Sequence, residues 1–272
     1  MRLLLLSTAL FLVLAFGSPQ LPPQLFDPLI SQKLLATANL TSGIPTSYPQ
    51  YTTRDTGAWL LFGADTWTSG FLPATFYALA ERATLCPHSM NGTTHEQWLE
   101  IARTSATGEI PLEARTSVGH DVGFLSFPFV DELALYVTLT ILTLHSPFLT
   151  HYSRLFRSPS NPNNKTARDA VKNFAAALAA RFDPIVGCTR SWDKGDPGDF
   201  LVIIDNMMNL EVLFSAADLT GNDTLRQIAI SHADKTMTNQ LREDGAPPLR
   251  ELLVALWPPL MTTLAQGRRF MS

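Results

Sequence analysis

Several features that would restrict function are scarce in this sequence. Only two cysteines are present, Cys86 and Cys188, so a disulfide framework is excluded and no metal-binding spacing of cysteines exists, although the two could pair in an oxidising compartment. No cluster of basic residues stands out, and the formal net charge is -4, which argues against nucleic acid as a partner. The 272 residues are 46% hydrophobic, enough to build the core of one large domain or two small ones.

The long apolar run at the N-terminus is too short to span a membrane comfortably. It extends from Leu3 to Phe16, follows Arg2 and is followed by small residues, which is typical of a secretory signal peptide over residues 1–17. Four N-x-Ser/Thr sequons fit a secreted glycoprotein; they lie at Asn39, Asn91, Asn164 and Asn222. We therefore expect a secreted, extracellular protein without a membrane partner.

Helical patterns separated by glycine or proline predict an all-α fold. Residues 18–50 form a Pro-rich strap with one helix near 24–38, and further helices are expected over 72–82 and 95–104. Thr166 and Asp223 each stand where a helix would be capped. The apolar stripe expected for the helix after Thr166 is Val171, Phe174, Leu178 and Phe182, and the face expected after Asp223 is Leu225, Ile228, Ala229 and His232. His232 is interpreted as a packed core histidine.

Residues 136–160 differ from this pattern. Thr alternates there with Val, Leu and Ile at period two, which indicates a strand in an otherwise helical chain. We interpret the segment as an anomalous insert.

The stretch from Gly187 to Leu210 is the most informative in the chain. It contains a turn, then Trp192, a polar loop, and an apolar run that ends at Asp205. A carboxyl group held in apolar surroundings has a raised pKa and can donate a proton. The alternative is that Asp205 caps the helix that follows.

A second carboxylate, Asp121, also precedes an apolar run, beside His120 and two residues before Gly123. Glycine at that position would let another segment approach the backbone closely. Paired carboxylates in different environments are usual in enzymes that act on sugars. Trp59 and Trp67 could form an aromatic wall for a sugar or could pack in the core.

Four motifs together resemble one family. HDVGF at 120–124, GCTRSWD at 187–193, IIDNMMNL at 203–210 and HADKTM at 232–237 are similar to motifs of the unsaturated glucuronyl hydrolases, glycoside hydrolase family 88, of the secreted fungal type. The resemblance covers the chain from about Trp59 to Gly245. It implies an (α/α)6 barrel, here incomplete, and a substrate with a 4,5-unsaturated uronic acid at its non-reducing end.

The resemblance also implies residue roles. Asp205 matches the acid/base that protonates C4 of the enol ether and then activates water, and Asp121 matches the second carboxylate, which stabilises the cation. Trp192, His120 and Trp67 are the expected substrate-binding residues. Neither a metal nor an organic cofactor is implied.

The chain departs from the family after Gly245. The family continues with further sugar-holding residues, whereas residues 246–272 form a divergent tail, so residues 51–245 are expected to be a partial domain, truncated relative to the family. Two alternatives stay open on the sequence alone: an inactive remnant that binds acidic sugars weakly or does not fold, and a hydrolase of unsaturated rhamnogalacturonan ends.

Overall fold

The computed structural model describes residues 22–133, 161–193, 199–240 and 269–271, and these residues confirm the all-α prediction. The α-helices described are α2 (Leu29–Leu40), α3 (Phe71–Leu85), α4 (His95–Ala106), α5 (Val122–Leu133), α6 (Lys165–Ala179), α7 (Asn206–Asn209), α8 (Glu211–Thr220) and α9 (Asp223–Gln240). Short 3-10 helices occur at Pro23–Phe26, Pro87–Ser89, Thr107–Glu113 and Gly119–Asp121. The strands described here form two-stranded sheets: β1 (Ser47–Thr52) with β2 (Trp59–Gly63), β3 (Phe182–Asp183) with β4 (Cys188–Thr189), and β5 (Asp199–Leu201) with β6 (Arg269–Met271).

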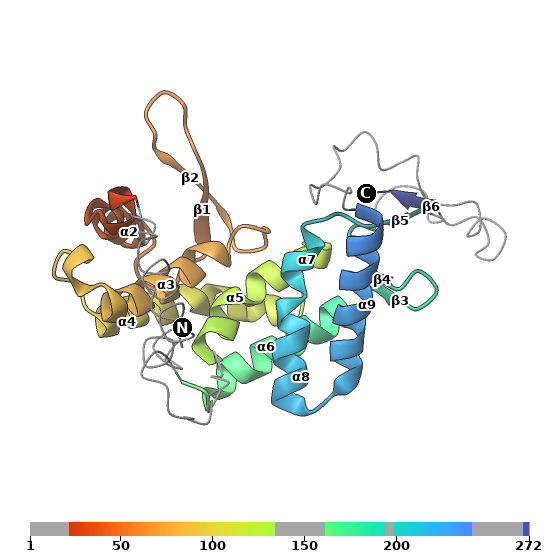
Figure 1. The fold of residues 1–272 in the computed structure, drawn as a ribbon. Helices are drawn as coiled ribbons and strands as arrows, with labels where there is room; N and C mark the ends of the chain where they lie inside the picture. The colour runs from red at the N-terminus through yellow and green to blue at the C-terminus, as the bar shows by residue number, and fades with distance from the viewer. Residues whose placement is uncertain (1–21, 134–160, 194–198, 241–268, 272) are drawn as a thin grey trace, which may run out of the picture.

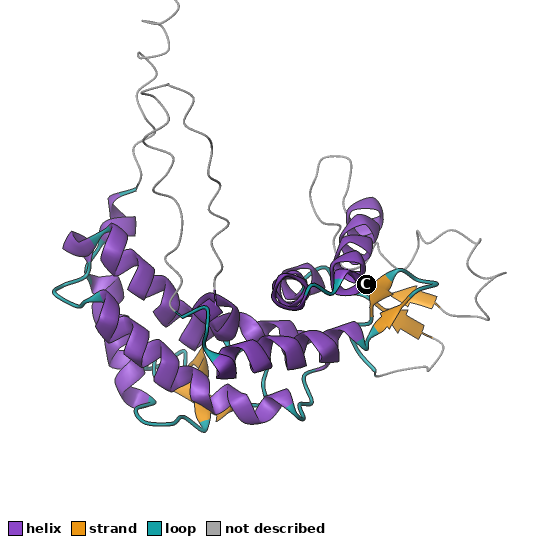
Figure 2. Ribbon diagram, turned by 90° about the horizontal axis from the view of Figure 1, so that it is seen from below, coloured by secondary structure: helices purple, strands orange, loops and turns teal. Residues whose placement is uncertain are grey.

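The helices lie in an open row that runs from α2 at one end to α9 at the other (Figure 1). Neighbours along the row pack in pairs, α3 with α4, α5 with α6, and α8 with α9. The view from below shows the same succession of helices, with the short strands at its edges (Figure 2). Stacked helix pairs of this kind are the building units of helical barrels and solenoids.

Two apolar cores hold the row together. The first joins α2, β1, α3 and α4 around Trp98, which is fully buried on the helix predicted for residues 95–104. The second joins α5, α6, α8 and α9 around Phe174 and Leu213. Because the segments around Asp121 and Asp205 lead into α5 and, through α7, into α8, the second core fixes their positions.

The helix predicted after Thr166 begins earlier than expected. The Asn164 side chain accepts from the backbone N–H of Ala167 and so caps α6, which makes Thr166 an interior residue. The Nδ2 of Asn164 also donates to the buried carboxylate of Glu132, 3.0 Å away. Asparagine caps a helix at least as well as threonine, and this second bond adds to its advantage at this position.

The apolar stripe of α6 is shorter than predicted. Val171, Phe174 and Leu178 are fully buried on one face, as expected. Phe182 lies beyond the end of the helix at Ala179, in β3. The stripe ends there because β3 turns back towards β4 through Gly187, whose φ is 77°.

At the start of α9, Asn222 takes the place expected of Asp223 by accepting from the N–H of Thr224. The face predicted for α9 agrees with the structure: Ala229 and His232 are buried, and Leu225 and Ile228 pack against the second core.

The β1–β2 hairpin is a feature that the sequence did not predict. It crosses the expected boundary at residue 50 and stands out from the row of helices (Figure 1). Its exposed residues include Trp59, so this indole is not a core residue; its Nε1 donates to Thr37. Cys86 and Cys188 are both free thiols, so the disulfide that the sequence left open is absent.

Several predictions fall outside the described residues: the signal peptide, the insert at 136–160 and most of the tail after residue 245. Within the described parts of the chain, the helices are all too short or too polar to cross a bilayer.

Candidate active site

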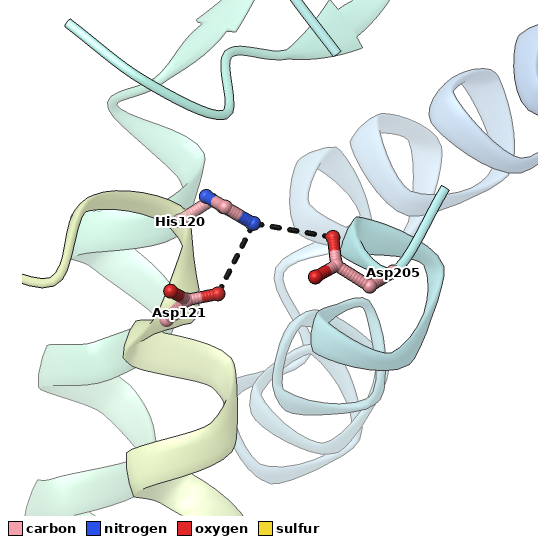
Figure 3. Close-up of side chains that lie close together, drawn as sticks. All are labelled: His120, Asp121 and Asp205. Atoms are coloured by element: carbon pink, nitrogen blue, oxygen red, sulfur yellow. Dashed lines mark hydrogen bonds and ion pairs between the residues drawn. The ribbon is translucent and has the colours of Figure 1, made fainter. Parts of the chain in front are cut away.

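The two aspartates singled out in the sequence lie on either side of one histidine (Figure 3). Asp121 ends the 3-10 turn Gly119–Asp121 that leads into α5, and Asp205 occupies the N-cap position of α7. The Nε2 of His120 is 3.1 Å from Oδ1 of Asp121 and 3.3 Å from Oδ1 of Asp205. The fold thus brings together residues 85 positions apart in the sequence.

The protonation of His120 follows from its surroundings. Its Nδ1 lies 2.7 Å from the carbonyl oxygen of Ser191; a carbonyl can only accept, so Nδ1 carries a proton. The side chain is 1% exposed. Its Nε2, directed at two carboxyl oxygens, either donates a proton to them or accepts one from a protonated carboxyl group. The three groups are therefore arranged to share a proton.

The two carboxyl groups differ in how deeply they are buried. The Asp121 side chain is 17% exposed, and its pKa is raised to about 6. Burial is the main cause; the charge of Asp205 also raises this pKa, while His120 and Arg181 lower it. The Asp205 side chain is 43% exposed. The desolvation that the sequence suggested for Asp205 is thus found at Asp121.

The capping interpretation of Asp205 is not borne out. Although Asp205 stands at the N-cap of α7, its backbone is helical and its side chain makes no hydrogen bond to the backbone N–H groups of the helix. The carboxylate instead faces His120 (Figure 3). Because this carboxylate is not bound to the helix backbone and is 43% exposed, a ligand could reach it.

Trp192 lies at the edge of this cluster. Its ring meets that of His120 edge-on, with centroids 5.7 Å apart, and the residue is 36% exposed. Trp67, 44% exposed, packs instead against Phe71 and Phe124 in the first turns of α3 and α5. Trp192 thus contacts His120 of the cluster directly, whereas Trp67 contacts Phe124, which lies three residues after Asp121.

Gly123 sets the spacing between the two halves of the site. A Cβ atom at this position would lie 2.3 Å from Oδ1 and 2.5 Å from Cα of Asn209. Such distances are impossible for any other residue without displacement of α7. The close approach predicted from the sequence is confirmed, and it brings the start of α5 against the end of α7.

A buried chain of hydrogen bonds fixes Asn206, the residue that follows Asp205. The N–H of Thr189 donates to Nδ1 of His232, 3.0 Å away, and Nδ2 of Asn206 donates to Oγ1 and O of Thr189 at 2.8 and 3.1 Å. His232 is fully buried, and burial lowers its pKa to about 4, with a smaller contribution from His120. It is therefore a neutral core histidine, as predicted, and it binds Thr189, which in turn binds Asn206, the residue that follows Asp205.

Ser191 is the residue of this site that sequence reasoning missed. It lies in the GCTRSWD motif between two residues that attracted attention, yet it is fully buried and contacts both halves of the site. Its main role uses a backbone carbonyl, and no sequence pattern marks such a group.

The same three side chains, His120, Asp121 and Asp205, are the one group among the described residues whose donor atoms are of metal-ligand type and lie within 4.8 Å of one another. We interpret them as a proton-sharing group. A carboxyl group of raised pKa next to an imidazole nitrogen satisfies its hydrogen bonds without a cation.

The relatives found by sequence comparison are unsaturated glucuronyl hydrolases and unsaturated chondroitin disaccharide hydrolases. No family model matches the chain. An unsaturated glucuronyl hydrolase of Formosa agariphila is 30% identical over 179 residues, which is 65% of this chain and 36% of the relative. An unsaturated chondroitin disaccharide hydrolase of Streptococcus pyogenes is 27% identical over 104 residues, 38% of this chain and 25% of the relative. The chain thus spans about a third or less of these curated relatives.

Solved structures agree on the fold. The crystal structure of an unsaturated glucuronyl hydrolase specific for heparin matches with a TM-score of 0.59 and 23% identity over 83% of this chain and 51% of that chain. The enzyme from Bacillus sp. GL1 matches with a TM-score of 0.55 and 20% identity, over 81% and 50% of the two chains. The likeness confirms the predicted (α/α)6 architecture for the part that the chain spans, about half of these structures.

Proposed function

We propose that this site hydrates the double bond of a 4,5-unsaturated uronic acid at the non-reducing end of an oligosaccharide. Hydration of this cyclic enol ether releases the terminal sugar without displacement at the anomeric carbon. One observation carries the proposal. Asp121 and Asp205 meet on a buried imidazole beside a half-exposed indole, in a chain similar in sequence and fold to unsaturated glucuronyl hydrolases.

The reaction needs one proton at its start. In our proposal, Asp205 delivers a proton to C4, positive charge develops at C5 beside the ring oxygen, and Asp205 then accepts a proton from the water that adds to C5. The hemiketal so formed opens and releases the next sugar. General acid–base catalysis of this kind contributes typically about 10²–10⁴-fold.

The proton is available because the pair of carboxyl groups holds it. Below about pH 6 Asp121 retains a proton, and the Nε2 of His120 contacts both Asp121 and Asp205. Nε2 can take the proton from Asp121 while Nδ1 keeps its own, and then pass it to Asp205. That transfer leaves Asp121 ionised, in the form that stabilises a neighbouring cation.

Substrate binding would favour the transfer. A sugar ring stacked on Trp192 would cover Asp205, and loss of water favours the protonated form of a carboxyl group. We assign His120, whose nitrogens are both engaged, to holding and linking the two carboxylates; Trp192 and, more remotely, Trp67 would contact the sugar. No metal or organic cofactor enters the scheme.

The test is turnover by the chain itself. Incubated with an unsaturated glucuronyl disaccharide, the chain should remove the absorbance of the conjugated double bond, while a saturated disaccharide of the same linkage should stay intact. Unsaturated rhamnogalacturonan disaccharide serves as a second substrate, since preference for it would reassign the substrate class. Saturable binding of the unsaturated disaccharide without turnover would identify a sugar-binding remnant and contradict the proposal.

A further inference from the structure

Ser191 joins the two halves of the site through its backbone and its side chain. Its N–H donates to the carbonyl of Leu201 at 2.7 Å, and its Oγ accepts from the N–H of Ile203 at 2.9 Å. These bonds hold it against the segment that ends at Asp205. Its carbonyl oxygen accepts from Nδ1 of His120. The position of this carbonyl therefore affects how His120 lies between the carboxylates.

A single guanidinium group holds the segment that carries this carbonyl. Arg181 follows the end of α6, and its side chain is 14% exposed. Nε donates to the carbonyl of Arg190 at 2.7 Å, and Nη2 donates to the carbonyl of Ser191 at 3.2 Å. Nη1 and Nη2 bind the two carboxylate oxygens of Asp193 at 2.9 and 3.1 Å. Arg181 thus binds Arg190, Ser191 and Asp193, the residues on both sides of Trp192.

The backbone of Gly119 also lies close to the Ser191 carbonyl. Gly119, which precedes His120, has φ of 68°, and a Cβ atom there would lie 3.1 Å from that carbonyl oxygen and 3.7 Å from Nη2 of Arg181. A carbonyl oxygen has two lone pairs, so it can accept from Arg181 and His120 at once. A side chain at position 119 would crowd this oxygen, and glycine avoids that contact.

We propose that Arg181 is a positioning residue of this site: by fixing the Ser191 carbonyl, it sets the orientation of His120 between Asp121 and Asp205. This inference rests on the proposed function for its consequence in catalysis, although the positioning itself can be observed without substrate. The planar fork of arginine suits the role because it serves two carbonyls and a carboxylate simultaneously, which a lysine ammonium cannot do.

Arg181 also has an electrostatic effect on Asp121. The charged or titratable groups that act on Asp121 are His120, Asp205 and Arg181, and His232 of α9 interacts with His120. Removal of the guanidinium charge should raise the pKa of Asp121, whereas Arg181→Lys keeps the charge and removes the planar fork. The lysine variant therefore separates the positioning role from the effect of the charge.

The experiment compares Arg181→Met and Arg181→Lys with a control, Arg226→Met. Arg226 pairs with Asp218 and Asp223 on the surface of α8 and α9. NMR of the substrate-free chain follows the ring nitrogens of His120, whose chemical shifts report the hydrogen bond from Nδ1 to the Ser191 carbonyl. We expect Arg181→Met and Arg181→Lys both to change these shifts, since neither side chain can hold both carbonyls and the Asp193 carboxylate, and Arg226→Met to leave them unchanged.

Turnover of the unsaturated disaccharide adds a second readout. Arg181→Met should lower kcat about 10- to 100-fold, because the catalytic groups are misplaced. It should also raise KM, because Trp192 lies between two residues that Arg181 binds. Unchanged His120 ring signals in folded Arg181→Lys overturn the inference whether or not the chain is active. Changed signals in a chain without turnover support the positioning and count against the proposed function.

Discussion

Replacement of Asp205 with asparagine should reduce turnover of an unsaturated glucuronyl disaccharide by about 10²–10⁴-fold. The amide keeps the shape of the side chain but can neither deliver a proton to C4 nor accept one from water. Binding should change little, because the amide retains most hydrogen bonding, so the loss should appear in kcat and not in KM. Single-turnover kinetics followed by the absorbance of the double bond measure both.

Glu211→Gln is a suitable control for this variant. Glu211 is an exposed carboxylate at the start of α8, six residues after Asp205, so the substitution makes the same chemical change on the same short stretch. It should leave turnover near the wild-type value. If Asp205→Asn retained activity within about threefold of wild type, its assignment as the acid would be wrong.

Replacement of Asp121 with asparagine should lower activity and raise stability together. Burial raises the pKa of Asp121 to about 6, so at pH 7 the folded chain holds an ionised group in unfavourable surroundings. A shift from the ordinary value of 3.8 to about 6 corresponds to about 3 kcal/mol, since one pKa unit is about 1.4 kcal/mol. Asp121→Asn should therefore unfold at higher urea concentration at pH 7 while turnover falls about 100-fold or more.

The pH dependence follows from the same shift. Between the ordinary pKa of an aspartate and about 6, the folded chain binds more protons at Asp121 than the unfolded chain does, so the contribution of Asp121 to stability falls as pH rises through this window. The activity of the wild type should fall as pH rises through about 6, because the pair then loses its shared proton. The stability gain of Asp121→Asn should vanish near pH 4.

The exposed Asp234→Asn on α9 is the matched control, and it should not reproduce the gain in stability at pH 7. An Asp121→Asn chain that is less stable than wild type at pH 7 would contradict the account of Asp121 as a desolvated carboxylate.

Much of the fold was predictable because helices carry their own signals. The periodic stripe of Val171, Phe174 and Leu178 and the buried Trp98 marked two helices correctly. The β1–β2 hairpin was not predictable, since its strand Trp59–Gly63 is exposed throughout and lacks the alternation that identifies a half-buried strand. The start of α6 was misplaced because Asn164 and Thr166 are both good caps, and the choice depends on Glu132, which is distant in the sequence.

The site, like the fold, was predictable only in part: its side chains were found, but their surroundings were not. The resemblance pointed to Asp121, Asp205 and Trp192, and the structure brings these side chains around His120. The environment of each carboxyl group could not be predicted: Val202 of the apolar run packs against Val186, Cys188 and Phe200, while the Asp205 side chain beside His120 remains 43% exposed. Contacts made by backbone carbonyls, such as that of Ser191, leave no mark in a sequence.

Reaction in deuterium oxide tests the central claim most directly. If the site hydrates the enol ether, the sugar that the chain releases should carry one deuteron at C4, detected by NMR at early reaction times before slow exchange next to the new carbonyl group. Displacement at the anomeric carbon would instead release a sugar that still contains its double bond and no deuterium at C4. The first result is the one we predict, and the second would contradict the account.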